Sequence, residues 1–251
     1  MKLTDNCFAV LGFGYYPPWI VNSGFILGAY QTLVVDSGPN YLAAQTIYGY
    51  AKNVKPGNEI IVVNTEKHLD HIGGNSLFKE FGVKIYGHKN IKRFDSELTE
   101  DKNYFNKSIL SDKRRELREE EIFFQNTIIV NPEFTVENNQ TFQLGGGVEA
   151  RIIYTFGHTS TNISIFIPAD KVLYSGDCIV SGYIPNLESS NIEDWIKWQK
   201  SLDMISKLNI DYVVPGHGKV LSGMEIIKEL KKIQSILEDA VKNGQAPTSE
   251  Q

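Results

Sequence analysis

Residues 64–75 read NTEKHLDHIGGN, and the six positions from Glu66 to His71 hold two histidines, an aspartate, a glutamate and a lysine. The residues just before it, NEIIVVNT (58–65), form an apolar run typical of a strand buried on both faces. Glu66 and His68 stand two positions apart at the end of that strand, so both side chains point to the same face. Asp70 and His71 follow where the chain turns toward a helix. Groups of these types are costly to place so close together unless something binds them, and the stretch therefore predicts a metal site.

Three further candidate ligands occur later in the chain, each beside a glycine. They are His158 in TFGHTSTN, Asp177 in VLYSGDCIV and His217 in VVPGHG. Asp177 and His217 each follow directly after a predicted strand. Glycine permits tight loops and a close approach of the backbone, so these loops are suited to placing ligands around one point.

The composition is that of an ordinary soluble globular protein. The chain has 251 residues, 41% hydrophobic and 22% charged, which suits one large domain or two small ones. The net charge of −5 argues against a nucleic-acid partner, for which a basic face would be expected. The two cysteines, Cys7 and Cys178, lie far apart without metal-type spacing, and we interpret them as free thiols in a reducing cytosol.

The N-terminal region carries no charged residue between Asp5 and Asp36, which raises the question of a membrane segment or signal peptide. Glycines and prolines break this region into short pieces, and no basic region or cleavage site precedes it. We therefore expect buried strands with turns, a cytoplasmic location and no membrane partner. No motif indicates an oligomeric state.

The remaining pattern predicts strands followed by helices, twice over. Ser190 with Glu193, and Ser222 with Glu225, form capping-box patterns that predict the starts of two late helices. The charged stretch SDKRRELREEE is predicted to be solvated and helical. The fold class is α+β, with two sheets packed together and helices outside. One domain is expected over residues 1–243, with a disordered tail at 244–251. Strands are predicted near 7–12, 22–28, 31–36, 58–65 and 83–87, then repeatedly over 127–174, with helices near 40–53, 72–82 and 90–120.

The ordered set ExHxDH, GHT, GD and GH resembles the signature of the metallo-β-lactamase superfamily, and the match spans nearly the whole chain. The resemblance implies an αβ/βα sandwich of two mixed sheets packed face to face, with metal ions at one edge. It also implies a site one of Glu66, His68 and His158, a site two of Asp70, His71 and His217, and Asp177 as the bridge.

Glu66 is a departure, since the family signature begins with histidine. A third carboxylate makes the formal charge of a hydroxide-bridged site neutral, one unit below the usual pattern. The implied cofactors are two divalent ions per chain, with zinc favoured, while the added oxygen ligand shifts preference toward iron or manganese. The alternative is that Glu66 pairs with Lys67 or another cation instead of a metal.

Several other residues are assigned supporting or structural roles. Asp36 in VVDSG is expected to accept hydrogen bonds behind the ligands. Thr159 and Asn162 are expected to fix the backbone around His158. His88 and Cys178 are interpreted as structural residues.

The stretch GFGYYPPWIV suggests a substrate-binding flap above the metals. Tyr15, Tyr16 and Trp19, stiffened by two prolines, would form an apolar wall, and the alternative is that they plug the end of the sandwich. Tyr183 and Ile184 in SGYIPNLES would face them.

The resemblance implies a hydrolase for a small-molecule substrate. A metal-bridging hydroxide would attack a carbonyl in an ester, thioester, lactone or β-lactam, and Asp70 would orient that nucleophile. One alternative is a flavodiiron-like or other non-haem iron redox protein, although flavodiiron proteins carry glutamate at the middle position, HxExDH. The other is a non-catalytic metal-binding protein.

Overall fold

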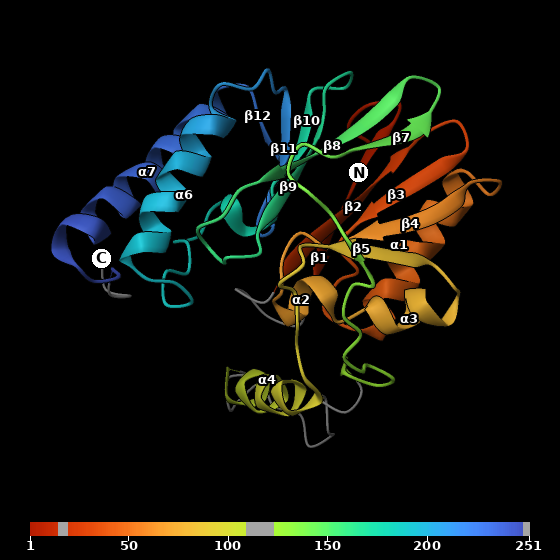
Figure 1. The fold of residues 1–251 in the computed structure, drawn as a ribbon, viewed down its shortest axis with the longest axis horizontal. Helices are drawn as coiled ribbons and strands as arrows, with labels where there is room; N and C mark the ends of the chain where they lie inside the picture. The colour runs from red at the N-terminus through yellow and green to blue at the C-terminus, as the bar shows by residue number, and fades with distance from the viewer. Residues whose placement is uncertain (15–19, 109–122, 248–251) are drawn as a thin grey trace.

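The computed structural model describes residues 1–14, 20–108 and 123–247. Its centre is a pair of six-stranded sheets that face each other (Figure 1). Both sheets are mixed, because β3, β4, β5 and β6 pair in parallel in the first, as do β10 and β11 in the second. The first sheet runs in sequence order through β1 (Cys7–Phe13), β2 (Val21–Leu27), β3 (Gln31–Val35), β4 (Glu59–Val63), β5 (Lys84–Gly87) and β6 (Phe134–Thr135).

The second sheet also follows sequence order. It comprises β7 (Thr141–Gly145), β8 (Val148–Tyr154), β9 (Ile163–Ile167), β10 (Val172–Tyr174), β11 (Tyr212–Val214) and β12 (Leu221–Ser222). The helices are α1 (Tyr41–Val54), α2 (Leu69–Ile72), α3 (Asn75–Glu80), α4 (Asp95–Ser108), α6 (Ile192–Ile205) and α7 (Met224–Asn243), with the short 3₁₀ helix η1 (Gly176–Cys178).

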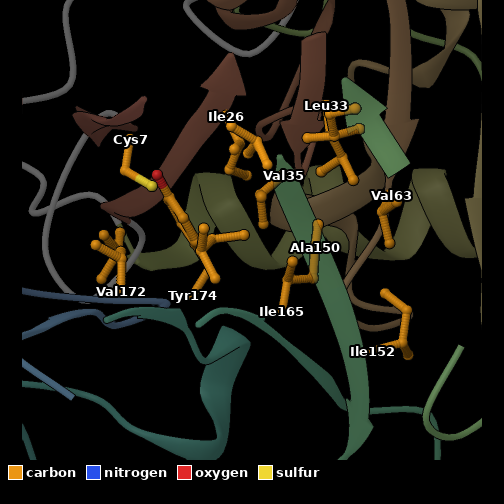
Figure 2. Packing of buried hydrophobic residues seen from close by; sticks show 14 of the residues in the cluster. Cys7, Ile26, Leu33, Val35, Val63, Ala150, Ile152, Ile165, Val172 and Tyr174 are labelled. Atoms are coloured by element: carbon orange, nitrogen blue, oxygen red, sulfur yellow. The ribbon is translucent and has the colours of Figure 1, made fainter. Parts of the chain in front are cut away.

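Three buried apolar clusters make this a four-layer αβ/βα sandwich, as predicted. The central cluster lies between the sheets, where Figure 2 shows Ile26, Leu33, Val35 and Val63 together with Ala150, Ile152 and Ile165. A second cluster packs α1 and α3 onto the first sheet, and a third packs α6 and α7 onto the second. Coverage on both faces explains why β2 is buried along its whole length and why β4 reads as a nearly continuous apolar run.

The sheets approach closely at the turn between β2 and β3. A Cβ placed on Gly28 would lie 1.9 Å from the carbonyl oxygen of Leu144, so only glycine fits there. In the part of the chain that the structure describes, no helix is long and apolar enough to cross a membrane.

The helix starts differ from the two predicted capping boxes. The N-cap of α6 is Asn191, whose side chain accepts hydrogen bonds from the amides of Glu193 and Asp194, while Ser190 bonds Leu187 and Trp195 instead. The predicted cap was therefore wrong by one residue, because asparagine caps at least as well as serine and occupies the extended N-cap position.

The second box forms only in part. The N-cap of α7 is Gly223 at φ 51°, and the amide of Ser222 donates to Glu225 at 3.4 Å without the reciprocal side-chain bond. The predicted helical stretch SDKRRELREEE lies outside the described residues. The predicted tail is described only as far as Pro247, and its Ala246 packs against the cluster of α6 and α7.

Candidate metal centre

All seven predicted ligands come from loops and short helices at one edge of the sandwich. Glu66 follows β4, His68 is the N-cap of α2, and Asp70 and His71 lie within α2. His158 lies between β8 and β9, Asp177 in η1 after β10, and His217 between β11 and β12. The structure gathers them into two groups, one of Glu66, His68, His158 and Asp177 and one of Asp70, His71 and His217, and within each group the candidate ligand atoms lie within 4.8 Å of one another.

In the first group, the Glu66 carboxylate and two imidazoles converge. Oε1 of Glu66 lies 2.7 Å from Nδ1 of His68 and 3.7 Å from Nε2 of His158. The His68 and His158 nitrogens are themselves 3.2 Å apart. Within the described chain, the ion pairs of Glu66 are all with histidines of the cluster, and the alternative pairing with Lys67 is not found.

In the second group, Nε2 of His217 lies 3.3 Å from Oδ2 of Asp70, and Nε2 of His71 lies 4.0 Å from the same oxygen. Asp177 lies between the groups. Its Oδ1 is 3.2 Å from Nε2 of His71, and its Oδ2 is 3.2 Å from Nε2 of His217 and 3.4 Å from Nε2 of His158. This placement is the one expected of a bridging carboxylate.

Asp36 orients His71 from behind, as predicted. Its Oδ2 lies 2.9 Å from Nδ1 of His71 and accepts from the Thr65 hydroxyl at 2.7 Å, and its Oδ1 accepts from the Thr65 amide at 2.7 Å. With Nδ1–H bonded to Asp36, His71 directs Nε2 toward the centre. Asp36 holds a left-handed φ of 60°, which aspartate tolerates better than most residues.

The remaining ligands are also held by hydrogen bonds. Nδ1 of His217 lies 2.7 Å from the carbonyl oxygen of Ile20, and the amide of Asp177 donates to the Asn162 side chain at 3.1 Å. A Cβ on Gly216 would lie 1.8 Å from Oδ1 of Asp177, so glycine makes room for that carboxylate. The backbone of His217 also pairs with both Val21 and Val180, which fixes this loop between the two sheets.

His158 is held from several sides. Its Nδ1 lies 3.2 Å from the carbonyl oxygen of Asn186, the Ser189 hydroxyl donates to its carbonyl oxygen at 3.1 Å, and its ring packs edge-on against Trp198. The carbonyl of Thr159 accepts from the amide of Gly157, and the carbonyl of Asn162 accepts from the amide of Thr155. Thr159 and Asn162 thus close the loop around His158 from both sides, in line with the backbone-fixing roles expected of them.

The carboxylates and imidazoles of the cluster shift one another's pKa values. Burial disfavours an ionised carboxyl, yet the charges of His68, His158 and His71 hold the pKa of Glu66 below its usual value. Burial likewise opposes ionisation of Asp177, and His217 and His71 hold its pKa well below the usual value. Burial alone would lower the pKa values of His71 and His217, but the charge of Asp177 raises both well above the ordinary value.

Three buried atoms at the centre show that the residues fit metal ions. Oε2 of Glu66, Nε2 of His71 and Oδ1 of Asp177 make no hydrogen bond to any described residue. Buried polar atoms normally make hydrogen bonds, so atoms of ligand type that lack them, all at one point, are suited to hold cations. The four imidazoles and three carboxylates are also a suitable donor set for zinc, iron or manganese.

A cavity of about 460 Å³ opens over both groups. Tyr183 and Ile184, which were expected to form a wall facing the flap, line it together with Leu69 and Val180, and their contact with substrate stays a prediction. Tyr15, Tyr16 and Trp19 lie outside the described residues. His88 is 5% exposed, packs against Tyr154 and Phe156, and belongs to neither ligand group, and Cys178 is fully buried.

Four polar residues in the cavity wall were not predicted: Arg93, Asn186, Glu188 and Ser189. The position of Arg93 could have been anticipated from the strand order. β4 and β5 are parallel neighbours, so the segments that follow them leave the sheet at the same edge. The other three lie on the loop that carries Tyr183, where no motif marks them.

Comparison with known proteins identifies the family and the fold. Residues 16–217 match the family model of the metallo-beta-lactamase superfamily. The type 2 metallo-beta-lactamase of Elizabethkingia meningoseptica is 27% identical over 224 residues, covering 86% of this chain and 77% of that protein. The acyl-coenzyme A thioesterase MBLAC2 of Gallus gallus is 25% identical over 209 residues, covering 78% and 72%.

Solved structures share the architecture. The DIM-1 metallo-beta-lactamase superposes with a TM-score of 0.66 at 20% identity, covering 96% of both chains. A metallo-beta-lactamase family protein from Thermus thermophilus superposes with a TM-score of 0.70 at 16% identity, covering 96% of this chain and 82% of that one. Because residues 16–217, most of this chain, match the family model, the chain belongs to the metallo-β-lactamase superfamily.

Proposed function

We propose that this protein is a hydrolase with two metal ions that cleaves a small carbonyl substrate, namely an ester, thioester, lactone or β-lactam. The observation that carries the proposal is the pair of ligand groups beneath one cavity. Three of their buried atoms make no hydrogen bond to a described residue. Relatives named as a β-lactamase and as an acyl-coenzyme A thioesterase support the carbonyl class. Zinc is the favoured metal because it suits imidazole and carboxylate ligands and is the usual metal of the family.

The chain offers Glu66, His68 and His158 to one ion and Asp70, His71 and His217 to the other, with Asp177 shared. When bound, two such ions lower the pKa of a shared water and polarise a carbonyl oxygen. Asp36, Asn162 and Gly216 keep the ligands in place before substrate arrives, so little reorganisation is needed during the reaction.

Asp70 has a second role in this proposal, which is to orient the attacking water and accept its proton. It lines the cavity, unlike the fully buried His71 beside it. Burial opposes ionisation of Asp70, yet His71 and His217 hold its pKa below the usual value, so the carboxylate is ionised and can accept a hydrogen bond from the attacking water.

The cavity wall divides into an apolar and a polar part. Leu69, Val180 and Ile184 offer an apolar surface to the acyl portion of a substrate, whereas Arg93 and Glu188 place charges at the wall. A cavity of this size suits a small molecule rather than a polymer.

A redox function is the second candidate, and the observation that favours it is Glu66. Its carboxylate lies among the ligand nitrogens, so the cluster has three carboxylates, and oxygen-rich sets favour iron.

The test is metal analysis together with a substrate panel. Protein purified without chelator is analysed for metals. It is then assayed with a p-nitrophenyl ester, an acyl-coenzyme A, a lactone and a chromogenic cephalosporin. We expect two ions per chain and turnover of at least one substrate. Asp70→Asn should reduce kcat about 10²–10⁴-fold, the usual contribution of a positioned acid or base, whereas Asp203→Asn, an exposed site on α6, should leave it unchanged. A metal-loaded protein that hydrolyses none of the panel refutes the proposal, and bound iron with a visible absorption band would favour the redox candidate.

A further inference from the structure

We propose that Glu66 is a second bridging ligand, so that two carboxylates, Glu66 and Asp177, join the two metal ions. The family signature places a histidine at this position, and a histidine ring nitrogen serves one ion only. The inference rests on the two-metal centre proposed above, and it does not depend on the substrate.

The contacts of Oε1 of Glu66 extend across both ligand groups. This oxygen lies 3.4 Å from Nε2 of His71, which belongs to the second group. Its distance to Nε2 of His158, in its own group, is longer at 3.7 Å. Its shortest contact is with Nδ1 of His68 at 2.7 Å, also in its own group, so this one oxygen reaches imidazoles of both groups.

Asp177 provides a comparison within the same site. It is assigned as a bridge because its oxygens lie 3.2 Å from His71 and 3.4 Å from His158, one imidazole from each group. Glu66 reaches the same two imidazoles through a single oxygen, Oε1, whereas Asp177 presents one oxygen to each. The two carboxylates therefore lie against the same His71 and His158 nitrogens, with both groups in reach of each.

The burial of Glu66 supplies the second observation. The residue is 0% exposed, and its Oε2 makes no hydrogen bond to a described residue. A fully buried carboxylate is stable only when cations or donors surround it. Oε1 lies among the imidazoles of both groups while Oε2 has no hydrogen bond to a described residue, so the two oxygens of this carboxylate can bind separate ions.

Bridging has a consequence that terminal binding lacks. A terminal ligand stabilises one ion, so its removal weakens one binding step. A bridging ligand contributes to both ions, so its removal weakens both steps and reduces the extent to which the first ion assists the second.

The experiment is a two-step zinc titration, followed by competition with a chromophoric chelator, on four proteins. These are the unaltered chain, Glu66→Gln, His68→Gln as a site-one control and Asp70→Asn as a site-two control. We expect each control to weaken one step by tenfold or more and leave the other within about threefold. Glu66→Gln should weaken both steps by tenfold or more. If Glu66→Gln weakens only the step that His68→Gln weakens, Glu66 is terminal and the proposal is overturned, and the same holds if neither step moves.

A crystal structure of the zinc-loaded unaltered chain decides the question even if a variant fails to fold. We expect oxygens of Glu66 at about 2.0–2.2 Å from both ions. Contact with one ion only overturns the proposal. Neither measurement uses catalysis, so an inactive protein with a Glu66 bridge refutes only the proposed hydrolysis, and an active protein with a terminal Glu66 refutes only the bridge.

Discussion

Replacing Asp36 with asparagine should misdirect His71 without changing the shape of the site. Asparagine has nearly the same volume and tolerates the left-handed backbone at this position. In the unaltered chain, the Asp36 carboxylate accepts hydrogen bonds from three donors: the Thr65 amide, the Thr65 hydroxyl and Nδ1–H of His71. An amide has one acceptor oxygen, so its NH₂ must face either the Thr65 amide or the pair formed by the Thr65 hydroxyl and His71.

The second orientation keeps the bond to the Thr65 amide and turns a donor toward His71. The imidazole then carries its proton on Nε2, which is the atom that faces Asp177 at 3.2 Å. A protonated Nε2 cannot ligate a metal. Loss of a partner behind a metal-binding histidine typically costs 10–100-fold in affinity, or about 1.4–2.8 kcal/mol.

The assay is zinc titration of Asp36→Asn beside the unaltered chain, with Asp211→Asn as the control. Asp211 is an exposed carboxylate paired with Lys171 at 3.6 Å, so its loss should leave zinc affinity unchanged. Nitrogen-detected NMR of the imidazoles reports the tautomer of His71 directly. Unchanged zinc affinity, together with a proton still on Nδ1, would refute the reasoning.

Three further outcomes are expected. Cys7 and Cys178 should resist Ellman's reagent at mildly alkaline pH in the folded protein, because burial raises the pKa of each thiol to about 12; rapid labelling before denaturant is added would contradict this. Gly28→Ala should lower the free energy of unfolding by about 1–3 kcal/mol, since its Cβ would strike Leu144, whereas Gly49→Ala, in the open interior of α1, should raise it by up to about 1 kcal/mol; denaturant titration checks both. Removal of metal by chelation should lower the unfolding temperature, since an ion at a hundredfold its Kd adds about 2.7 kcal/mol per site; an identical melting curve with and without metal would rule this out.

The sequence was most informative where a local pattern of residue types is typical of one kind of structure, such as a buried strand or a metal site. The apolar run before Glu66 predicted a buried strand. The dense cluster at 66–71, three later ligand-type residues beside glycines and the resemblance to the family signature together indicated the seven positions that the structure gathers. Asp36 in VVDSG was also expected to accept hydrogen bonds behind the ligands, although it lies 30 residues before Glu66 in the sequence. These inferences needed only local pattern and the order of the motifs.

What the sequence could not provide depends on distances between remote segments. Ser190 and Asn191 are both good caps, and the choice between them depended on Leu187 and Trp195, which occupy the serine. The distances from Glu66 to His71 and His158, 3.4 and 3.7 Å, depend on how segments far apart in the sequence pack together. Arg93 lies in a charged stretch that resembles any solvated helix, and only the packing of the strands brings it to the cavity.

The division of the ligands along the chain has a consequence for how the protein is made. Glu66, His68, Asp70 and His71 leave the ribosome together, whereas His217 follows about 150 residues after His71, which at ordinary synthesis rates is about 7–30 s later. During that interval a short acidic and histidine-bearing segment is present without its later partners. Copper binds such nitrogen and oxygen groups more tightly than zinc, iron or manganese does. The nascent chain therefore carries its first four candidate ligands, open to copper, before its second sheet exists, and closure of the sandwich is the step that brings the remaining three to them.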